Sequence, residues 1–155
     1  MKITHATMQD LAAVTAVESA CFPPAEAATE KDFTGRIQHY GNHFWLLFDG
    51  DRLIAFVDGF VTDEADLTDE MYENAAMHNE NGAWQMIFGV NTLPEYRKRG
   101  YAEELIRRAI DDARAQGRKG LVLTCKEKLI HYYGKFGFAD EGVSDKSTNG
   151  NVVWH

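Results

Sequence analysis

The hydrophobic positions in the first part of the chain indicate a short strand, two helices and a β-hairpin. After a strand over residues 2–5, apolar residues recur at helical spacing as far as Cys21, and two prolines then end that helix. A second helix is expected from Thr29 to about residue 40. Residues 43–48 and 53–61 are rich in aromatic and branched side chains, and the Asp-Gly-Asp turn between them predicts a hairpin.

Strands and helices alternate in the second part of the chain, after an acidic connection over residues 62–82. The expected elements are a short helix at 68–77, a strand at 83–91 interrupted by Gly89, a helix at 101–116, a strand at 121–125, a helix at 128–136 and a strand pair within 143–154. Strands separated by helices pair in parallel through right-handed crossovers, whereas hairpin strands are antiparallel. The sequence therefore predicts an α/β protein with a mixed β-sheet.

Length and composition are those of one globular domain, which we expect to span residues 1–155. The chain has 45% hydrophobic residues, no apolar run near the roughly 20 residues of a membrane-spanning helix, and no N-terminal run typical of a signal peptide. We therefore expect a cytoplasmic location and no membrane partner. Cys21 and Cys125 lie far apart and outside any metal-type spacing, so two reduced thiols and no metal site are expected.

Charge is unevenly distributed along the chain. The total of −8 argues against a nucleic-acid partner, because affinity for phosphate backbones comes mostly from clustered positive charge. Residues 1–92 carry four basic and fifteen acidic side chains, whereas residues 93–155 carry twelve basic and nine acidic ones. Two interpretations are open: a solvated acidic face, or a cationic ligand near the first part and an anionic ligand in the second.

The basic stretch before the longest predicted helix is a candidate phosphate site. It combines three cations, a glycine and the start of the helix, in the order Arg97, Lys98, Arg99, Gly100, Tyr101 and Ala102. The first amides of a helix have no intrahelical partner, and the helix dipole favours an anion beside them. Neither a Walker phosphate loop nor the triple-glycine dinucleotide motif is present. A phosphate or pyrophosphate fits here, and the alternative is a basic loop with a simple turn glycine.

The order of motifs around this stretch resembles the GNAT superfamily of acetyl-CoA-dependent N-acetyltransferases. Residues 97–102 meet the family pattern Arg/Gln-x-x-Gly-x-Gly/Ala, and residues 133–138 meet its Tyr-x-x-x-Gly-Phe ending. Residues 21–22, 63–68 and 123–125 resemble bacterial proteins similar to serotonin (arylalkylamine) N-acetyltransferase. The resemblance implies the GNAT fold, a mixed central sheet of about seven strands with a bulged, splayed strand pair and helices on both faces.

The resemblance also implies acetyl-CoA as co-substrate and a way to bind it. In the family, the pantetheine arm pairs like an extra strand with the bulged strand, here with the main chains of Phe88 and Val90. Splayed strands leave N–H and C=O groups unpaired, and an amide-bearing ligand can satisfy them. The pyrophosphate is held by the loop that follows Arg97, whose residues are Lys98, Arg99, Gly100, Tyr101, Ala102 and Glu103.

Attack of an amine on a thioester requires a base for the ammonium group, an oxyanion donor and an acid for the leaving thiolate. The main-chain N–H near Phe88 is the expected oxyanion donor. The resemblance implies that Tyr133 is the acid, with Tyr132 and His131 as alternatives.

The base departs from the pattern of the serotonin acetyltransferases, which carry two histidines on the bulged strand. Trp84 and Met86 occupy the matching positions, and neither accepts a proton. The candidates are Glu18 at the end of the first helix, a water chain to solvent, or one of four other side chains, Asp63, Glu64, His39 and His43. Trp84 and Met86, with Phe22 and Pro23, form either an apolar acceptor pocket or part of the core.

The predicted reaction is transfer of an acetyl group from acetyl-CoA to a small-molecule primary amine, by direct attack on the thioester, in a monomer or homodimer. A non-catalytic acyl-CoA sensor on the same fold is the alternative, and the presence of Tyr133 favours the enzyme. A small interaction module would have no need of Gly89, Gly100 and Tyr133 at these spacings. The sequence leaves the acceptor open among metabolites, polyamines and protein N-termini.

Overall fold

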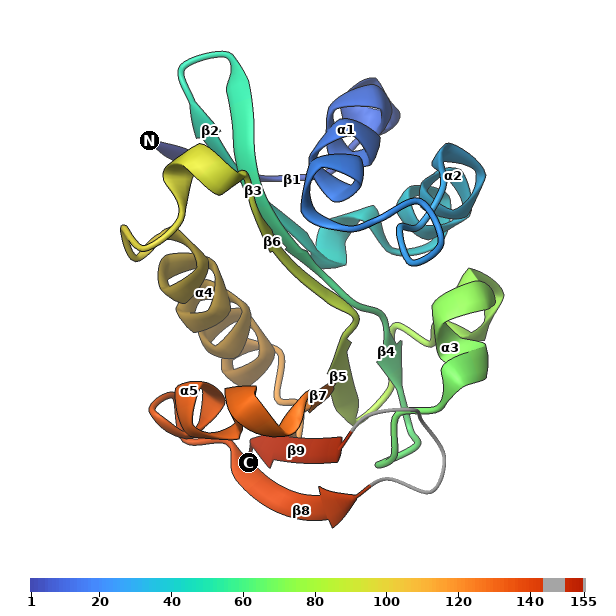
Figure 1. Ribbon diagram of the computed structural model, residues 1–155. Helices are drawn as coiled ribbons and strands as arrows, with labels where there is room; N and C mark the ends of the chain where they lie inside the picture. Colours follow the sequence, from blue (N-terminus) through green and yellow to red (C-terminus); the bar gives the residue numbers. More distant parts are fainter. Residues whose placement is uncertain (144–149, 155) are drawn as a thin grey trace. The chain divides into compact units, whose positions relative to one another are not determined.

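The computed structural model describes residues 1–143 and 150–154, and the chain divides into two compact units. The first unit comprises Met1–Gly59 and Gly89–Ala109, and the second comprises Phe60–Phe88 and Ile110–His155. Figure 1 traces the chain through its helices and strands. The longest helix, α4 (Tyr101–Ala115), begins in the first unit and ends in the second.

A four-stranded antiparallel sheet forms the base of the first unit. Its strands, in spatial order, are β1 (Lys2–His5), β2 (Phe44–Asp49), β3 (Arg52–Asp58) and β6 (Gly89–Thr92). The predicted hairpin is confirmed as β2 and β3, and Gly50 adopts a φ of 59° in its turn, a conformation that glycine reaches without strain. Where β3 pairs with β6, Asp58 lies directly opposite Gly89.

Two predicted helices, α1 (Leu11–Cys21) and α2 (Glu30–Tyr40), lie side by side in the first unit (Figure 1). The side chain of Thr29 caps α2 by accepting from the N–H of Asp32 at 3.2 Å. The helix α1 packs on β3 and β6. Phe33 of α2 lies edge-on to Phe44 and Phe56, with ring centroids 6.2 and 5.8 Å away. These contacts fix both helices over the β3–β6 strand pair.

The second unit contains a five-stranded sheet. Its strands, in spatial order, are β4 (Val61–Thr62), β5 (Trp84–Ile87), β7 (Gly120–Cys125), β9 (Gly150–Trp154) and β8 (Ala139–Val143). The pair β5 and β7 is parallel and the other pairs are antiparallel. The predicted strand pair of the tail is confirmed as β8 and β9, while residues 144–149 lie outside the described residues.

Short helical segments complete both units. The remaining α-helices are α3 (Asp69–Glu73) and α5 (Ile130–Gly134). The 3₁₀ turns are η1 (Met8–Asp10), η2 (Gly41–His43), η3 (Ala75–Met77), η4 (Pro94–Tyr96) and η5 (Glu127–Leu129). Among the described helices, none has the length and apolar character needed to cross a membrane.

The mixed α/β fold class is confirmed, and the strand count differs from the expectation. The predicted strand 53–61 is two strands, β3 and β4, and the predicted strand 83–91 is also two, β5 and β6. The described residues therefore hold nine strands in two sheets, in place of about seven in one. Both breaks occur where the chain leaves one sheet and enters the other. The predicted helices 68–77 and 128–136 are each split into a short α-helix and a 3₁₀ turn.

Candidate functional site

The basic loop before α4 has an unusual backbone. Lys98 has a φ of 63° and Gly100 has a φ of 83°, so two of its residues are left-handed. Successive N–H groups in such turns point into one concavity, which favours an anion. The residues 97–100 are exposed, and residues 101–103, in the first turn of α4, are half-buried. The loop and the helix start together offer main-chain donors and positive charge for a phosphate group.

The two arginines of this loop contact the rest of the first unit. Arg97 Nε donates to the main-chain oxygen of Thr92 at 3.1 Å, and the Cys21 thiol donates to the same oxygen at 3.3 Å. Burial raises the pKa of Cys21, although Arg97 opposes this shift, so the thiol stays protonated at neutral pH. The Arg99 guanidinium lies 5.6 Å from the centre of the Tyr96 ring. These contacts hold the start of the loop on the end of β6.

Five polar side chains are buried where α1 and α2 cover the β3–β6 strand pair. They are Glu18 of α1, Arg36 and Tyr40 of α2, Asp58 of β3 and Asn91 of β6, and we call them the buried polar cluster. Asp58 and Asn91 are the most enclosed of its carboxyl and amide groups, with 1% and 2% of their surface exposed. Polar groups in such a place are costly unless they are hydrogen-bonded.

Glu18, a candidate base from the sequence, is part of this cluster. Its Oε1 accepts from Asn91 Nδ2 at 2.7 Å, and its Oε2 accepts from the N–H of Ala28 at 2.8 Å. The carboxylate is therefore held in one orientation by groups from β6 and from the segment that follows α1. A carboxylate that already accepts two hydrogen bonds still has lone pairs for a further donor.

Asp58 was not identified from the sequence. Its Oδ2 accepts from Arg36 Nη1 at 3.3 Å and from the Tyr40 hydroxyl at 3.5 Å. Burial raises the pKa of Asp58 to about 6; Arg36 opposes this shift and the charge of Glu18 adds to it. The available signal was that Arg36 and Asp58 are charged residues inside otherwise apolar patterns. Their pairing depends on how α2 packs over β3, which periodicity does not reveal.

Tyr133, the expected acid, is on α5 in the second unit and has 8% of its surface exposed. Its ring centroid lies 5.1 Å from that of Tyr132 and 5.9 Å from that of Phe138. Burial raises the pKa of the Tyr133 hydroxyl, and Tyr132, Cys125 and Tyr72 add to the shift. The phenol is therefore protonated at neutral pH and is able to donate a proton.

Phe88 lies between β5 and β6, outside either strand. Its ring centroid is 4.9 Å from that of Phe60 and 5.0 Å from that of Tyr72. The Tyr72 hydroxyl and Thr124 Oγ1 are 3.1 Å apart and share a hydrogen bond. These contacts tie the end of β5 to α3 and β7 within the second unit. The strand interruption predicted at Gly89 is found one residue earlier, at Phe88.

The four side chains expected to line an acceptor pocket divide between the units. Met86 is fully buried in the second unit, where it pairs with Val122 of β7, and Trp84 is half-buried on the same strand. Phe22 and Pro23 follow α1 in the first unit, and both are exposed. Met86 is thus a core residue of its unit, and the shared pocket stays a prediction.

The other candidate bases have varied surroundings. His39 and Glu64 are exposed, while His43 is buried. Asp63 Oδ1 accepts from the N–H of Ala83 at 3.1 Å, which gives this exposed carboxylate a role in holding the chain before β5. His131, an alternative acid, is exposed on α5. None of these observations selects one of them as a base.

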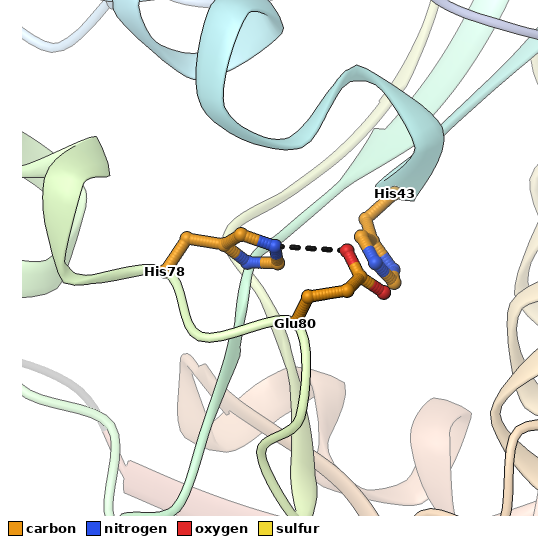
Figure 2. A group of neighbouring side chains, drawn as sticks. All are labelled: His43, His78 and Glu80. Atoms are coloured by element: carbon orange, nitrogen blue, oxygen red, sulfur yellow. Dashed lines mark hydrogen bonds and ion pairs between the residues drawn. The ribbon is translucent and has the colours of Figure 1, made fainter.

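An ion-pair network in the second unit was not anticipated from the sequence. Figure 2 shows His78 and Glu80, whose Nε2 and Oε1 atoms are 3.0 Å apart. His78 Nδ1 accepts from the N–H of Val61 at 3.0 Å, so its Nε2 carries the proton that it donates to Glu80. Arg118 Nη2 lies 3.0 Å from Glu80 Oε2. The network fastens the segment before β5 to β4 and to the chain that follows α4.

The structure contains a basic loop at the start of a long helix, a strand broken between two sheets and a buried tyrosine before a Gly-Phe pair. These are the features that the sequence resemblance associates with acyl-CoA-dependent acyltransferases. The family comparison agrees with this assignment. The chain belongs to the acetyltransferase (GNAT) family, whose family model matches residues 11–138.

Solved structures with low sequence identity share the fold over nearly the whole of both chains. The loading GNATL domain of CurA from Lyngbya majuscula is 16% identical with a TM-score of 0.85, covering 99% of this chain and 96% of that one. The GNAT-like decarboxylase GphF, in complex with isobutyryl-CoA, is 18% identical with a TM-score of 0.81, covering 99% and 97%. A GNAT acetyltransferase from Brucella melitensis in complex with acetyl-CoA is 19% identical with a TM-score of 0.62, covering 99% and 95%.

Proposed function

We propose that the protein is an N-acetyltransferase that moves the acetyl group of acetyl-CoA to a small primary amine by direct attack on the thioester. The observation that carries the proposal is the family match together with a protonated, buried Tyr133 at the position of the family's acid. A similar structure is in complex with acetyl-CoA, which supports acyl-CoA as the co-substrate.

In this proposal, the basic loop and the first turn of α4 bind the pyrophosphate. The left-handed residues Lys98 and Gly100 and the exposed cations of the loop fit that ligand. The main chains of Phe88 and Val90 bind the pantetheine arm, and the N–H near Phe88 stabilises the oxyanion. Tyr133 then donates its proton to the departing sulfur.

The acceptor is proposed to be a small amine with an apolar portion, attracted by the acidic first part of the chain. Phe22, Pro23, Trp84 and Met86 are the proposed contacts of that portion, and Glu18 is a proposed base. We also propose that, within the GNAT family, this protein is related to bacterial proteins similar to serotonin N-acetyltransferase. We further propose one domain over residues 1–155 that acts in the cytoplasm as a monomer or homodimer, without metal or nucleic acid.

Two other functions make different predictions. A non-catalytic acyl-CoA sensor binds acetyl-CoA and releases no thiol from it. A decarboxylase is the second candidate, because the similar structure of GphF is that of a GNAT-like decarboxylase. Such an enzyme would release carbon dioxide from a carboxylated acyl-CoA, for example malonyl-CoA, without an amine.

The deciding experiment measures free thiol from acetyl-CoA against a panel of primary amines, with carbon dioxide release from malonyl-CoA in parallel. Tyr133→Phe should lower kcat by roughly 100-fold or more and leave the Kd for acetyl-CoA unchanged, since the hydroxyl is needed chiefly in the transition state. Tyr132→Phe is the matched control on the same helix and should keep the parental kcat. Parental turnover by Tyr133→Phe would exclude it as the acid, and thiol release by no amine would refute the proposed function.

A further inference from the structure

Two oxygen atoms of the buried polar cluster lack donors. Asp58 Oδ1 and Asn91 Oδ1 are both buried, and neither has a hydrogen-bond partner among the described residues. A buried acceptor without a donor has lost its hydrogen bonds to water and gained none in return, so native structures rarely leave one unsatisfied. The unsatisfied oxygen of Asp58 indicates a site for a group that brings its own N–H or O–H donors.

The site borders a strand with access to solvent. Asp58 lies opposite Gly89, and a Cβ atom on Gly89 would stand 3.0 Å from Asp58 Oδ1 and 3.5 Å from Asn91 Nδ2. Glycine is the residue that leaves this space beside the carboxyl group. Gly89 and Val90 are half-buried, so this stretch of β6 is reachable although the cluster beneath it is enclosed. Val90 is also the residue whose main chain the proposed function gives to the pantetheine arm.

Charge selects the kind of group that enters. The ionisable groups around Asp58 are Glu18 from α1 and Arg36 and Tyr40 from α2, while β6 contributes the neutral Asn91. With both carboxylates ionised, one guanidinium leaves the cluster with a net charge of −1. A cation is therefore favoured over a neutral molecule, and a primary ammonium group supplies three N–H donors in a small volume.

We propose that the buried polar cluster binds the ammonium group of the acceptor and that Asp58 is the base that takes its proton. This inference rests on the proposed function and adds a residue to it. Asp58 Oδ1 accepts one proton from the ammonium group and later passes it to solvent. The amine lone pair then forms the C–N bond to the thioester carbon, and the C–S bond breaks. The thiolate takes a proton from Tyr133, and the second proton lost from nitrogen passes through solvent to restore the Tyr133 hydroxyl. The net products are therefore the amide, the free thiol and one proton released to solvent.

The environment of Asp58 suits this role. Burial raises the pKa of Asp58 to about 6, close to the range in which a base is both ionised at neutral pH and basic enough to accept a proton. Glu18 accepts from Asn91 Nδ2, the atom of Asn91 that lies beside the Gly89 position, and so fixes the orientation of this amide. Glu18 then acts as a positioning residue, which differs from its role as a candidate base.

The first test is independent of turnover. Carbon-13 NMR of labelled aspartate carboxyl groups follows the titration of Asp58, identified as the resonance that is missing in Asp58→Asn. Addition of 2-phenylethylammonium should lower the apparent pKa of Asp58, because a bound cation favours the carboxylate. Its N,N,N-trimethyl derivative has the same charge and no N–H donor, and it should leave the titration unchanged. No shift with 2-phenylethylammonium, or an equal shift with both compounds, would overturn the proposal.

The second test uses the pH dependence of amine-dependent thiol release. Asp58→Asn should lower kcat/KM for 2-phenylethylamine by roughly 100-fold at pH 7.5, remove the fall in kcat/KM below about pH 6, and keep the Kd for acetyl-CoA. The loss should shrink to less than about 10-fold with 2,2-difluoro-2-phenylethylamine, which is largely neutral at that pH and needs no base before attack. Asp51→Asn, an exposed change in the β2–β3 turn, is the control.

The outcomes distinguish failure of the proposed function from failure of Asp58 as the base. If acetyl-CoA supports no amine-dependent thiol release, the proposed function fails, while the NMR titration still tests ammonium binding at Asp58. If thiol release is robust and Asp58→Asn keeps the parental pH profile, the proposed function stands and Asp58 is not the base. In either case, far-ultraviolet circular dichroism must first show that Asp58→Asn is folded.

Discussion

At the scale of residues, the ionisation of Asp58 opposes folding. Burial raises its pKa from 3.8 to about 6, so the folded protein binds this proton more tightly than the unfolded chain does. Stability from this group is fully present below about pH 4 and is lost as the pH rises through about 6, by on the order of 3 kcal/mol.

The corresponding prediction concerns the difference between Asp58→Asn and the parent. The free energy of unfolding of the variant, relative to the parent, should rise by on the order of 3 kcal/mol between pH 4 and pH 7, because only the parent pays to ionise the carboxyl group. Urea denaturation at the two pH values measures this difference, and Asp51→Asn should show no such change. A relative stability that is the same at both pH values would contradict the assigned pKa.

Single residues also show which features can be predicted from the sequence alone. The capping residue Thr29 and the helix-ending prolines act within a few positions of the chain, and the structure confirms the helices they predict. The hydrogen-bond partners of Asp58 are Arg36 and Tyr40, which reach it only after α2 packs over β3. Local pattern therefore offered Glu18 as a candidate, the family resemblance implied Tyr133, and neither indicated Asp58.

At the scale of elements, the loop before α4 combines a strained backbone with positive charge. Gly100 has a φ of 83°, and Gly117, after α4, has a φ of 74°. In both glycines an added Cβ would meet no described atom within 4 Å, so alanine at either position is disfavoured by the backbone alone. Alanine would therefore cause similar backbone strain at the two positions, which lie at opposite ends of α4.

This match provides a prediction for the phosphate site. Gly100→Ala and Gly117→Ala should each destabilise the protein by about 1 kcal/mol, but only Gly100→Ala should weaken acetyl-CoA binding, by at least several-fold. Isothermal titration calorimetry with acetyl-CoA gives the affinities, and thermal unfolding gives the stabilities. Equal affinities in the two variants would show that the conformation of the loop does not determine binding.

The two segments that were each predicted as one strand, 53–61 and 83–91, are each divided in the structure for the same reason. Residues 53–62 and 84–92 are mostly apolar, and in both a glycine lies at or next to the point where the chain changes sheets, Gly59 in the first and Gly89 in the second. The break at Phe88 was anticipated within one residue because Gly89 was visible, whereas the break after Asp58 was not anticipated. A glycine shows where a strand can be interrupted, but whether the chain changes sheets there depends on hydrogen-bonding partners that are distant in sequence.

At the scale of the whole molecule, the chain crosses between its two units several times. It leaves the first unit after Gly59, returns at Gly89, and leaves again inside α4 after Ala109. Each unit is therefore assembled from segments that are distant in sequence, and neither is a continuous stretch that could be cut out. Unfolding one unit would interrupt α4 and would release the strand ends that lead into the other sheet.

We therefore expect one cooperative unfolding transition, in keeping with a single domain. Trp45 is buried in the first unit and Trp84 is half-buried in the second, so each reports on one unit. Two variants, Trp84→Phe/Trp154→Phe and Trp45→Phe/Trp154→Phe, each keep one of these reporters. Within each variant, the urea midpoint from fluorescence should equal the midpoint from far-ultraviolet circular dichroism. Because both midpoints come from the same variant, the effect of the substitutions on stability cancels. Because circular dichroism sees both units, a fluorescence midpoint that departs from it in either variant would mean that the units unfold separately.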